Sequence, residues 1–153
     1  MVVDDEPSIR SLLATVLTKA NYEVIEASDA STLREAFSGP QPEVMLLDLK
    51  LPDADGLELL PAIKKQWPQT EVIILTGHAT IDAAVAATKL GAYDFQKKPF
   101  DHKSLLVAVE RAGEDLRRLS GGRLRHHVGG EEERRDNGGG PRGLPHAATS
   151  LFC

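Results

Sequence analysis

Short apolar runs rich in β-branched residues alternate with longer segments of helical period through the first 118 or so residues of the chain. This alternation is typical of βα units wound around a parallel sheet. Strands that are covered by helices on both faces are expected to be apolar along most of their length. Five runs meet this description: Met1–Asp4, Tyr22–Ala27, Glu43–Asp48, Glu71–Thr76 and Tyr93–Lys97.

Five helices are expected between and after these strands. The first is indicated by apolar residues at the i, i+3, i+4 spacing of a helix buried on one side, namely Ile9, Leu12, Leu13, Val16, Leu17 and Ala20. The others are expected at Ser31–Phe37, Gly56–Gln66, Ile81–Leu90 and Lys103–Leu119. Pro7 suits the first turn of a helix, and Gly91 stands just past the end of one. The predicted fold class is therefore α/β, a doubly wound, five-stranded parallel sheet in the order (βα)₅.

The chain changes character after Leu119. Residues 120–153 contain eight glycines and almost no periodic apolar pattern, and such a segment cannot bury enough surface to order itself. We therefore predict a folded domain at residues 1–119 and a Gly/Arg-rich disordered tail at residues 120–153. Two alternatives stay open for the tail. One is a basic nucleic-acid-binding segment, which Glu131–Glu133 disfavour, and the other is a non-native C-terminus such as a frameshifted or truncated gene would produce.

Charge narrows the range of partners. The chain of 153 residues has a formal net charge of −5, and residues 1–119 carry 13 Lys and Arg against 19 Asp and Glu. An acidic body repels nucleic-acid phosphates, so we expect no direct nucleic-acid binding by this chain.

The cysteine content and hydropathy of the chain indicate the cellular compartment in which the protein is expected. The single cysteine, Cys153, allows no intramolecular disulfide. No apolar run approaches the roughly 20 residues of a membrane helix, and the start MVVDDEPS lacks the features of a signal peptide. We therefore predict a cytoplasmic protein without a membrane partner.

Three carboxylates are expected to meet at one edge of the sheet. Asp4 and Asp5 end the first predicted strand and Asp48 ends the third, and open parallel sheets build their sites at the C-terminal ends of their strands. Three like charges so close repel one another and call for a cation. All-oxygen ligands favour Mg²⁺, which keeps several of its waters. Taken alone, an Asp-Asp pair after a strand is usually a solvated turn or a helix cap, so the prediction depends on further partners.

A hydroxyl and an ammonium supply those partners. Thr76 ends the fourth predicted strand, and Lys97, Lys98 and Pro99 follow at the end of the fifth. Phosphoryl transfer spreads negative charge over three oxygens, which a metal ion, a lysine and a hydroxyl can stabilise together. Asp48 is then the predicted nucleophile, and its acyl phosphate suits a temporary signal. Side chains alternate across a strand, so one lysine of the two faces the crevice readily, and we expect it to be Lys98.

Four motifs occur in order on the predicted strands: VVDDEPSIR, LLDLKLPDADGLELL, VIILTGHA and GAYDFQKKPFD. Over residues 1 to about 118 the chain resembles the receiver domains of bacterial two-component response regulators, and its last motif resembles the nitrogen-regulation type. The resemblance implies a flavodoxin-like fold with strand order 2-1-3-4-5. It also implies a phosphoprotein that a sensor histidine kinase phosphorylates, and that is not an enzyme beyond catalysing its own aspartyl phosphorylation and dephosphorylation.

The resemblance assigns the metal ligands residue by residue. It implies that Asp48 is the phosphoacceptor and that Asp5, Asp48 and the backbone carbonyl of Lys50 bind Mg²⁺. Asp4 would support the metal through water.

The same resemblance implies a switch. Thr76 and Lys98 would contact the phosphoryl group, with a cis peptide before Pro99 aiming Lys98 inward. Phe95 would turn into the space that Thr76 vacates, although an aromatic residue in a strand is often only core. The change would reach the face formed by the fourth helix, the fifth strand and the fifth helix, through which a homodimer or a partner could dock.

Rival interpretations are weaker. A haloacid-dehalogenase-type phosphatase requires an Asp two residues after the nucleophile, where this chain has Lys50. A phosphorylation-independent receiver-like module would be favoured by loss of a site residue, and none is lost. A fragment of a transcriptional activator remains an alternative, although no GxxxxGK phosphate loop is present. His78 is expected to be a solvated loop residue, and the abrupt start at MVVDD suggests a truncated first strand with some loss of stability.

Overall fold

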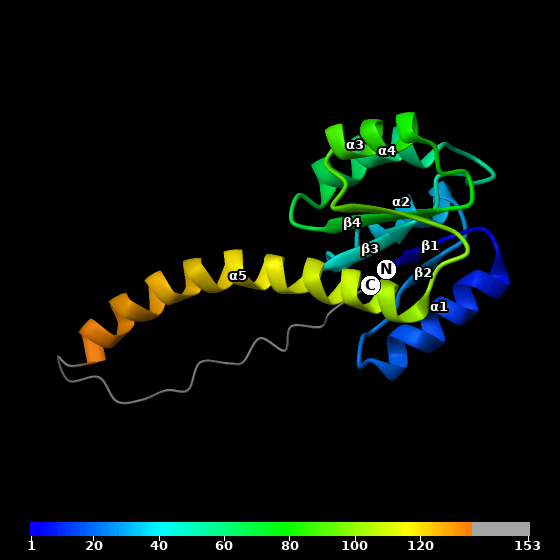
Figure 1. Cartoon of the computed structure of the whole chain (residues 1–153). Coiled ribbons are helices and arrows are strands. Elements are labelled where there is room, and N and C mark those ends of the chain that lie inside the picture. Colours follow the sequence, from blue (N-terminus) through cyan, green and yellow to red (C-terminus); the bar gives the residue numbers. More distant parts are fainter. Residues whose placement is uncertain (136–153) are drawn as a thin grey trace.

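The computed structural model describes the backbone of residues 1–135 and the side chains as far as Leu119. Figure 1 shows the helices packed around a central sheet. The elements follow in the order β1 (Val2–Val3), α1 (Pro7–Lys19), β2 (Glu26–Ala27), α2 (Ala30–Ala36), β3 (Val44–Leu47), α3 (Gly56–Gln66), β4 (Glu71–Thr76), α4 (Ile81–Lys89), β5 (Asp94–Lys97) and α5 (His102–Arg135). Within these residues one five-stranded sheet has the order β2-β1-β3-β4-β5 with parallel neighbours, which confirms the predicted fold class and strand order.

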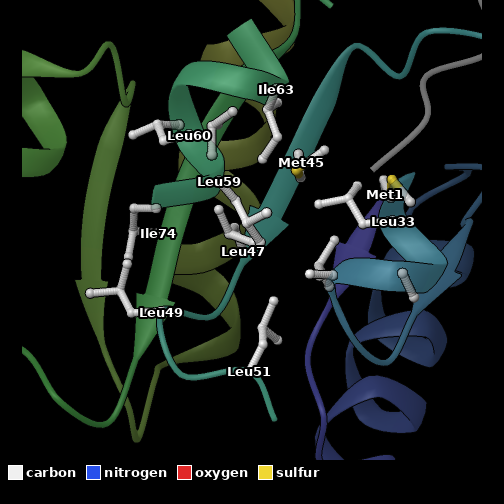
Figure 2. Close-up of a cluster of buried hydrophobic side chains, with 14 of the residues drawn as sticks. Met1, Leu33, Met45, Leu47, Leu49, Leu51, Leu59, Leu60, Ile63 and Ile74 are labelled. Carbon is white, nitrogen blue, oxygen red and sulfur yellow. The ribbon is translucent and has the colours of Figure 1, made fainter. Parts of the chain in front are cut away.

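Two apolar layers cover the sheet, and the alternation of side chains along β3 assigns its residues to them. Met45 and Leu47 join a core cluster with α2, α3 and α4, whereas Val44 and Leu46 join a second cluster with α1 and α5. Figure 2 shows side chains of the first cluster, among them Leu59, Leu60 and Ile63 of α3 and Met45 and Leu47 of β3. Successive strand side chains point to opposite faces, so burial on both sides explains why the strands are continuous apolar runs.

The helix ends agree with the local chemistry of the chain. Asp29, Asp55 and Thr80 each accept a backbone N–H of the helix that follows them, which satisfies donors that have no partner inside the helix. Gly91 has φ +98°, a left-handed conformation, just after α4, where a terminating glycine was predicted.

The first two strands are shorter than predicted. β2 contains Glu26–Ala27 rather than Tyr22–Ala27, because it is an edge strand that pairs only with the two-residue β1. The backbone of Met1–Asp4 nevertheless bonds to both neighbouring segments: Asp4 N–H donates to the Ala27 carbonyl over 3.1 Å, and the Met1 carbonyl accepts from Leu46 over 2.8 Å. The N-terminal ammonium donates to the Val44 carbonyl over 2.8 Å. Met1–Asp4 thus spans the centre of the sheet.

Helix α5 continues beyond the predicted end at Leu119 and is helical to Arg135, so the expectation of a disordered segment from residue 120 differs from the structure. Figure 1 shows this yellow-to-orange end of α5 extending away from the sheet. Helical hydrogen bonds join residues four apart and require no contact with the core. A helix can therefore continue beyond the last residue of its apolar pattern. The rest of the predicted tail, residues 136–153, lies outside the described residues.

Among the residues of α5 whose side chains the structure describes, those buried against the sheet lie near the start of the helix. Leu105, Val109 and Ala112 are buried in the second core cluster, whereas Leu119 is 65% exposed. Glycine in a helix interior costs roughly 1 kcal/mol relative to alanine, and the segment after Leu119 contains four glycines before Arg135. We propose that the independently folded receiver ends near Leu119.

A fragment of residues 1–119 is expected to unfold at nearly the same temperature as the whole chain. If the folded unit ends near Leu119, removal of the later residues is expected to change the free energy of unfolding by less than about 0.5 kcal/mol, which corresponds to less than about 3 °C for a domain of this size. Calorimetry of the two proteins measures this difference, and limited proteolysis should leave a stable fragment that ends near Leu119. A large loss of stability in the shorter chain would place residues beyond 119 in the folded unit.

Candidate functional site

The three predicted carboxylates lie together at the C-terminal edge of the sheet. Asp4 and Asp5 follow β1, and Asp48 follows the neighbouring β3. One carboxylate oxygen of each residue lies within 4.8 Å of the others. Asp4 and Asp48 are buried, whereas Asp5 is exposed. The set therefore opens to solvent on the side of Asp5.

Lys98 supplies the nearest positive charge. Its Nζ donates to Asp4 Oδ2 over 2.6 Å and to Asp48 Oδ2 over 3.1 Å, and the ammonium is largely shielded from solvent. The peptide between Lys98 and Pro99 is cis, as the resemblance implied. Lys97 is exposed, so it is Lys98 that faces the carboxylates.

The environment of Lys98 keeps it charged. Burial by itself would lower the pKa of the Lys98 ammonium, but the hydrogen bonds and negative charges of Asp4 and Asp48 outweigh burial and raise that pKa above its ordinary value. The single positive charge of Lys98 is not enough to balance three carboxylates. A net negative charge therefore remains at the site and attracts a cation.

Backbone contacts fix the orientation of the two buried carboxylates. Asp4 Oδ1 accepts the N–H of Glu6 over 3.0 Å, and Asp48 Oδ1 accepts the N–H of Lys50 over 3.3 Å. Gly56 packs directly against the backbone of Asp48, because a Cβ at position 56 would lie 2.6 Å from the Asp48 carbonyl oxygen. A side chain at the start of α3 would thus displace the backbone of the predicted phosphoacceptor.

The residues that rim this site define a hollow of about 180 Å³. Its lining includes four predicted site residues (Asp5, Asp48, Lys50 and Lys98) and three residues that were not predicted to belong to the site (Glu6, Gly77 and His78). Glu6 and Gly77 each follow a predicted site residue directly in the chain. This adjacency was the feature of the sequence from which they could have been predicted. His78 is exposed, in agreement with the expectation of a solvated loop residue.

The predicted switch residues lie on the two strands beside the site. Thr76 ends β4 with its side chain fully buried, and its Oγ1 accepts the N–H of His78 over 3.2 Å. Phe95 lies on β5 opposite Ile74 and packs against the first core cluster. In this arrangement Phe95 is a partly buried core residue, and Thr76 is held by the loop that follows it.

The donor set is suited to magnesium. The three carboxylates offer oxygen ligands, which hard Mg²⁺ prefers, and the opening at Asp5 leaves room for the waters that Mg²⁺ retains. The residues present therefore fit the ion that the sequence predicted.

Comparison with known proteins defines the class. The chain matches the response regulator receiver domain model over residues 1–110, and it belongs to that family. Receiver domains are signalling domains of two-component systems that bind Mg²⁺ through acidic residues and interact with histidine kinases, and they are not classical enzymes.

The individual relatives are of the nitrogen-regulation type, as the resemblance indicated. The chain is 43% identical over 119 residues to the nitrogen assimilation regulatory protein NtrX of Azorhizobium caulinodans, covering 76% of this chain and 26% of that one. It is 41% identical over 111 residues to the DNA-binding transcriptional regulator NtrC of Escherichia coli K12, covering 72% and 24%. The receiver domain of NtrX from Brucella abortus superposes with a TM-score of 0.69 at 43% identity, covering 74% of this chain and 96% of that one. The chain thus spans about a quarter of the length of these curated relatives.

None of the helices within residues 1–135 is long and apolar enough to cross a membrane.

Proposed function

We propose that the chain is a phosphoacceptor receiver that a sensor histidine kinase phosphorylates on Asp48 in a Mg²⁺-dependent reaction. The observation that carries the proposal is the single Lys98 ammonium bonded to both Asp4 and Asp48 beside the exposed carboxylate of Asp5. This arrangement brings a carboxylate nucleophile, a lysine ammonium and further carboxylate oxygens to one hollow. A cytoplasmic location is consistent with this function.

The chemistry uses the residues as follows. A carboxylate oxygen of Asp48 forms a bond to phosphorus as the bond from phosphorus to the donor's histidine nitrogen breaks, and the imidazole leaves with the bonding electrons. Lys98 turns from the carboxylates to pair with the phosphoryl oxygens, and the Thr76 hydroxyl donates to another. Asp5, Asp48 and the Lys50 carbonyl would hold Mg²⁺, with Asp4 supporting it through water, and the bound ion would supply positive charge beside the phosphoryl group. Hydrolysis of the acyl phosphate by water ends the signal.

The output is proposed to be a change in the face formed by α4, β5 and α5. This face already exposes large apolar side chains, among them Ile81 at 84%, Val85 at 49% and Val107 at 45%. A hollow of about 580 Å³ lies between β5 and α5 on the same side. A solved structure at 39% identity is that of a beryllofluoride-activated receiver domain dimer of NtrC4, which supports a homodimer. We assign the contact to this face because of its exposed apolar side chains.

Incubation with Mg²⁺ and acetyl phosphate is expected to add one phosphoryl group and to shift the amide resonances of α4 and β5. Thr76→Ala should accept the phosphoryl group through Asp48 and Lys98 but shift those resonances far less, because the hydroxyl supplies the differential affinity for the two states. Mass spectrometry measures the first effect and amide chemical shifts the second.

Thr76→Ser is the matched control, since it keeps the hydroxyl and should restore the shifts. Equal shifts in the parent and Thr76→Ala would remove Thr76 from the switch and leave Phe95 as ordinary core. A parent protein that accepts no phosphoryl group with Mg²⁺ would instead favour the phosphorylation-independent module.

A further inference from the structure

One carboxylate near the site has a partner elsewhere in the chain. Asp53 stands in the loop between β3 and α3, and its Oδ1 accepts the N–H of Ala30 over 2.8 Å while its Oδ2 accepts the N–H of Ser31 over 3.0 Å. Ala30 and Ser31 are the first residues of α2, more than twenty positions earlier in the chain. Both oxygens of one side chain therefore join the loop after Asp48 to a separate helix.

The contact is chemically favourable and is additional to the local cap of α2. The first N–H groups of a helix have no partner inside it and lie at its positive end, where a carboxylate forms charge-assisted hydrogen bonds. Asp29 already caps α2 locally, since its Oδ1 accepts the N–H of Thr32 over 2.7 Å. The additional effect of Asp53 is to hold the β3–α3 loop against the start of α2.

The loop is closed at its base as well as held at its tip. Lys50 and Asp55 form an antiparallel bridge, and the N–H of Gly56 donates to the Leu49 carbonyl over 2.6 Å. The Lys50 carbonyl therefore lies in a short turn whose base adjoins Asp48 and whose tip is anchored by Asp53. Because backbone contacts close the turn on itself, we expect release of its tip to shift the Lys50 carbonyl as well.

We propose that Asp53 is a positioning residue for the metal site: by clamping the β3–α3 loop to the N-terminus of α2, it holds the Lys50 carbonyl where Mg²⁺ requires an oxygen ligand. The inference rests on the proposed function of the site. Mg²⁺ demands nearly ideal octahedral geometry, so its affinity is sensitive to a small displacement of one ligand. Residues that orient metal ligands typically change metal affinity by about 10–100-fold when they are removed.

Mg²⁺ titration of the whole chain, followed by amide chemical shifts, tests the role of Asp53. Asp53→Ala is expected to weaken Mg²⁺ binding by about tenfold, and Asp53→Asn, which keeps one acceptor oxygen, should lie between it and the parent. Asp29→Ala is the matched control, because it removes a cap from the same helix without touching the loop. It should lose stability yet bind Mg²⁺ within about twofold of the parent.

The outcomes separate the two proposals. If the parent binds Mg²⁺ and both Asp53 variants bind it equally well, the positioning role is overturned and the proposed function stands. If Asp29→Ala weakens binding as much as Asp53→Ala, the effect belongs to the stability of α2 and the inference is also overturned. A parent that binds no Mg²⁺ would overturn the proposed function together with this inference. Should Asp53→Ala fail to fold, Asp53→Asn carries the test alone.

Discussion

Asp48→Asn is expected to abolish phosphorylation while leaving the fold intact. Asparagine has the shape of aspartate and keeps an oxygen that can accept from Lys98, so the contact now made over 3.1 Å can be retained. It lacks the anionic oxygen that attacks phosphorus. Removal of a nucleophile commonly lowers the rate by at least about 1000-fold, so labelling by acetyl phosphate with Mg²⁺ should fall below detection.

Asp55→Asn is the matched control for this experiment. Asp55 lies in the same loop, is exposed, and accepts the N–H of Leu57 over 2.9 Å at the start of α3. Asparagine and aspartate are nearly equivalent as helix N-caps, so this variant should take up the phosphoryl group as the parent does. Undiminished labelling of Asp48→Asn would show that the phosphoryl group is carried elsewhere and would refute the assignment.

Asp5→Ala should remove most of the Mg²⁺ affinity. Asp5 is the exposed member of the carboxylate cluster, so its loss leaves the core untouched and takes away a proposed direct ligand. Residues that only orient a metal ligand are worth about 10–100-fold in affinity, and a direct ligand is expected to be worth at least as much. Phosphorylation should decline in parallel, because Lys98 alone cannot supply the positive charge that Mg²⁺ would bring to the phosphoryl group.

Glu6→Ala provides the comparison for Asp5→Ala. Glu6 is the next residue, is also exposed and lines the same hollow, but it is not a member of the three-carboxylate cluster. Its removal lowers the local negative charge equally, so it should reduce Mg²⁺ affinity by no more than about threefold through the general field alone. A Mg²⁺ titration in which the two variants behave alike would reject Asp5 as a ligand.

The amino-acid sequence was enough to predict the architecture and the edge of the sheet where the candidate site residues gather. Strand alternation and helix period are local properties of the chain, so five βα units could be identified from apolar patterning alone. Because the C-terminal ends of parallel strands share one edge, the positions of Asp4, Asp48, Thr76 and Lys98 at strand ends were enough to predict that edge as the site. The same alternation indicated that only one of Lys97 and Lys98 faces the crevice readily, and the resemblance to receiver domains favoured Lys98.

The sequence was less informative about where β2 and α5 end. The length of β2 was overestimated because an edge strand extends only as far as its partner, and that partner, β1, has two residues. The end of α5 was placed at Leu119 because the apolar pattern stops there, whereas helical hydrogen bonds continue without such a pattern to Arg135.

Only the tertiary structure decided how the site is held in place. Nothing near Asp53 in the chain indicates that its carboxylate reaches Ala30 and Ser31, and nothing near Gly56 indicates that a Cβ there would meet the carbonyl of Asp48. These contacts join elements that are distant in sequence and depend on the packing of α2 and α3 against the sheet. Sequence periodicity specifies on which face of its helix or strand a side chain lies. The distance between two such elements depends on all the side chains that pack between them.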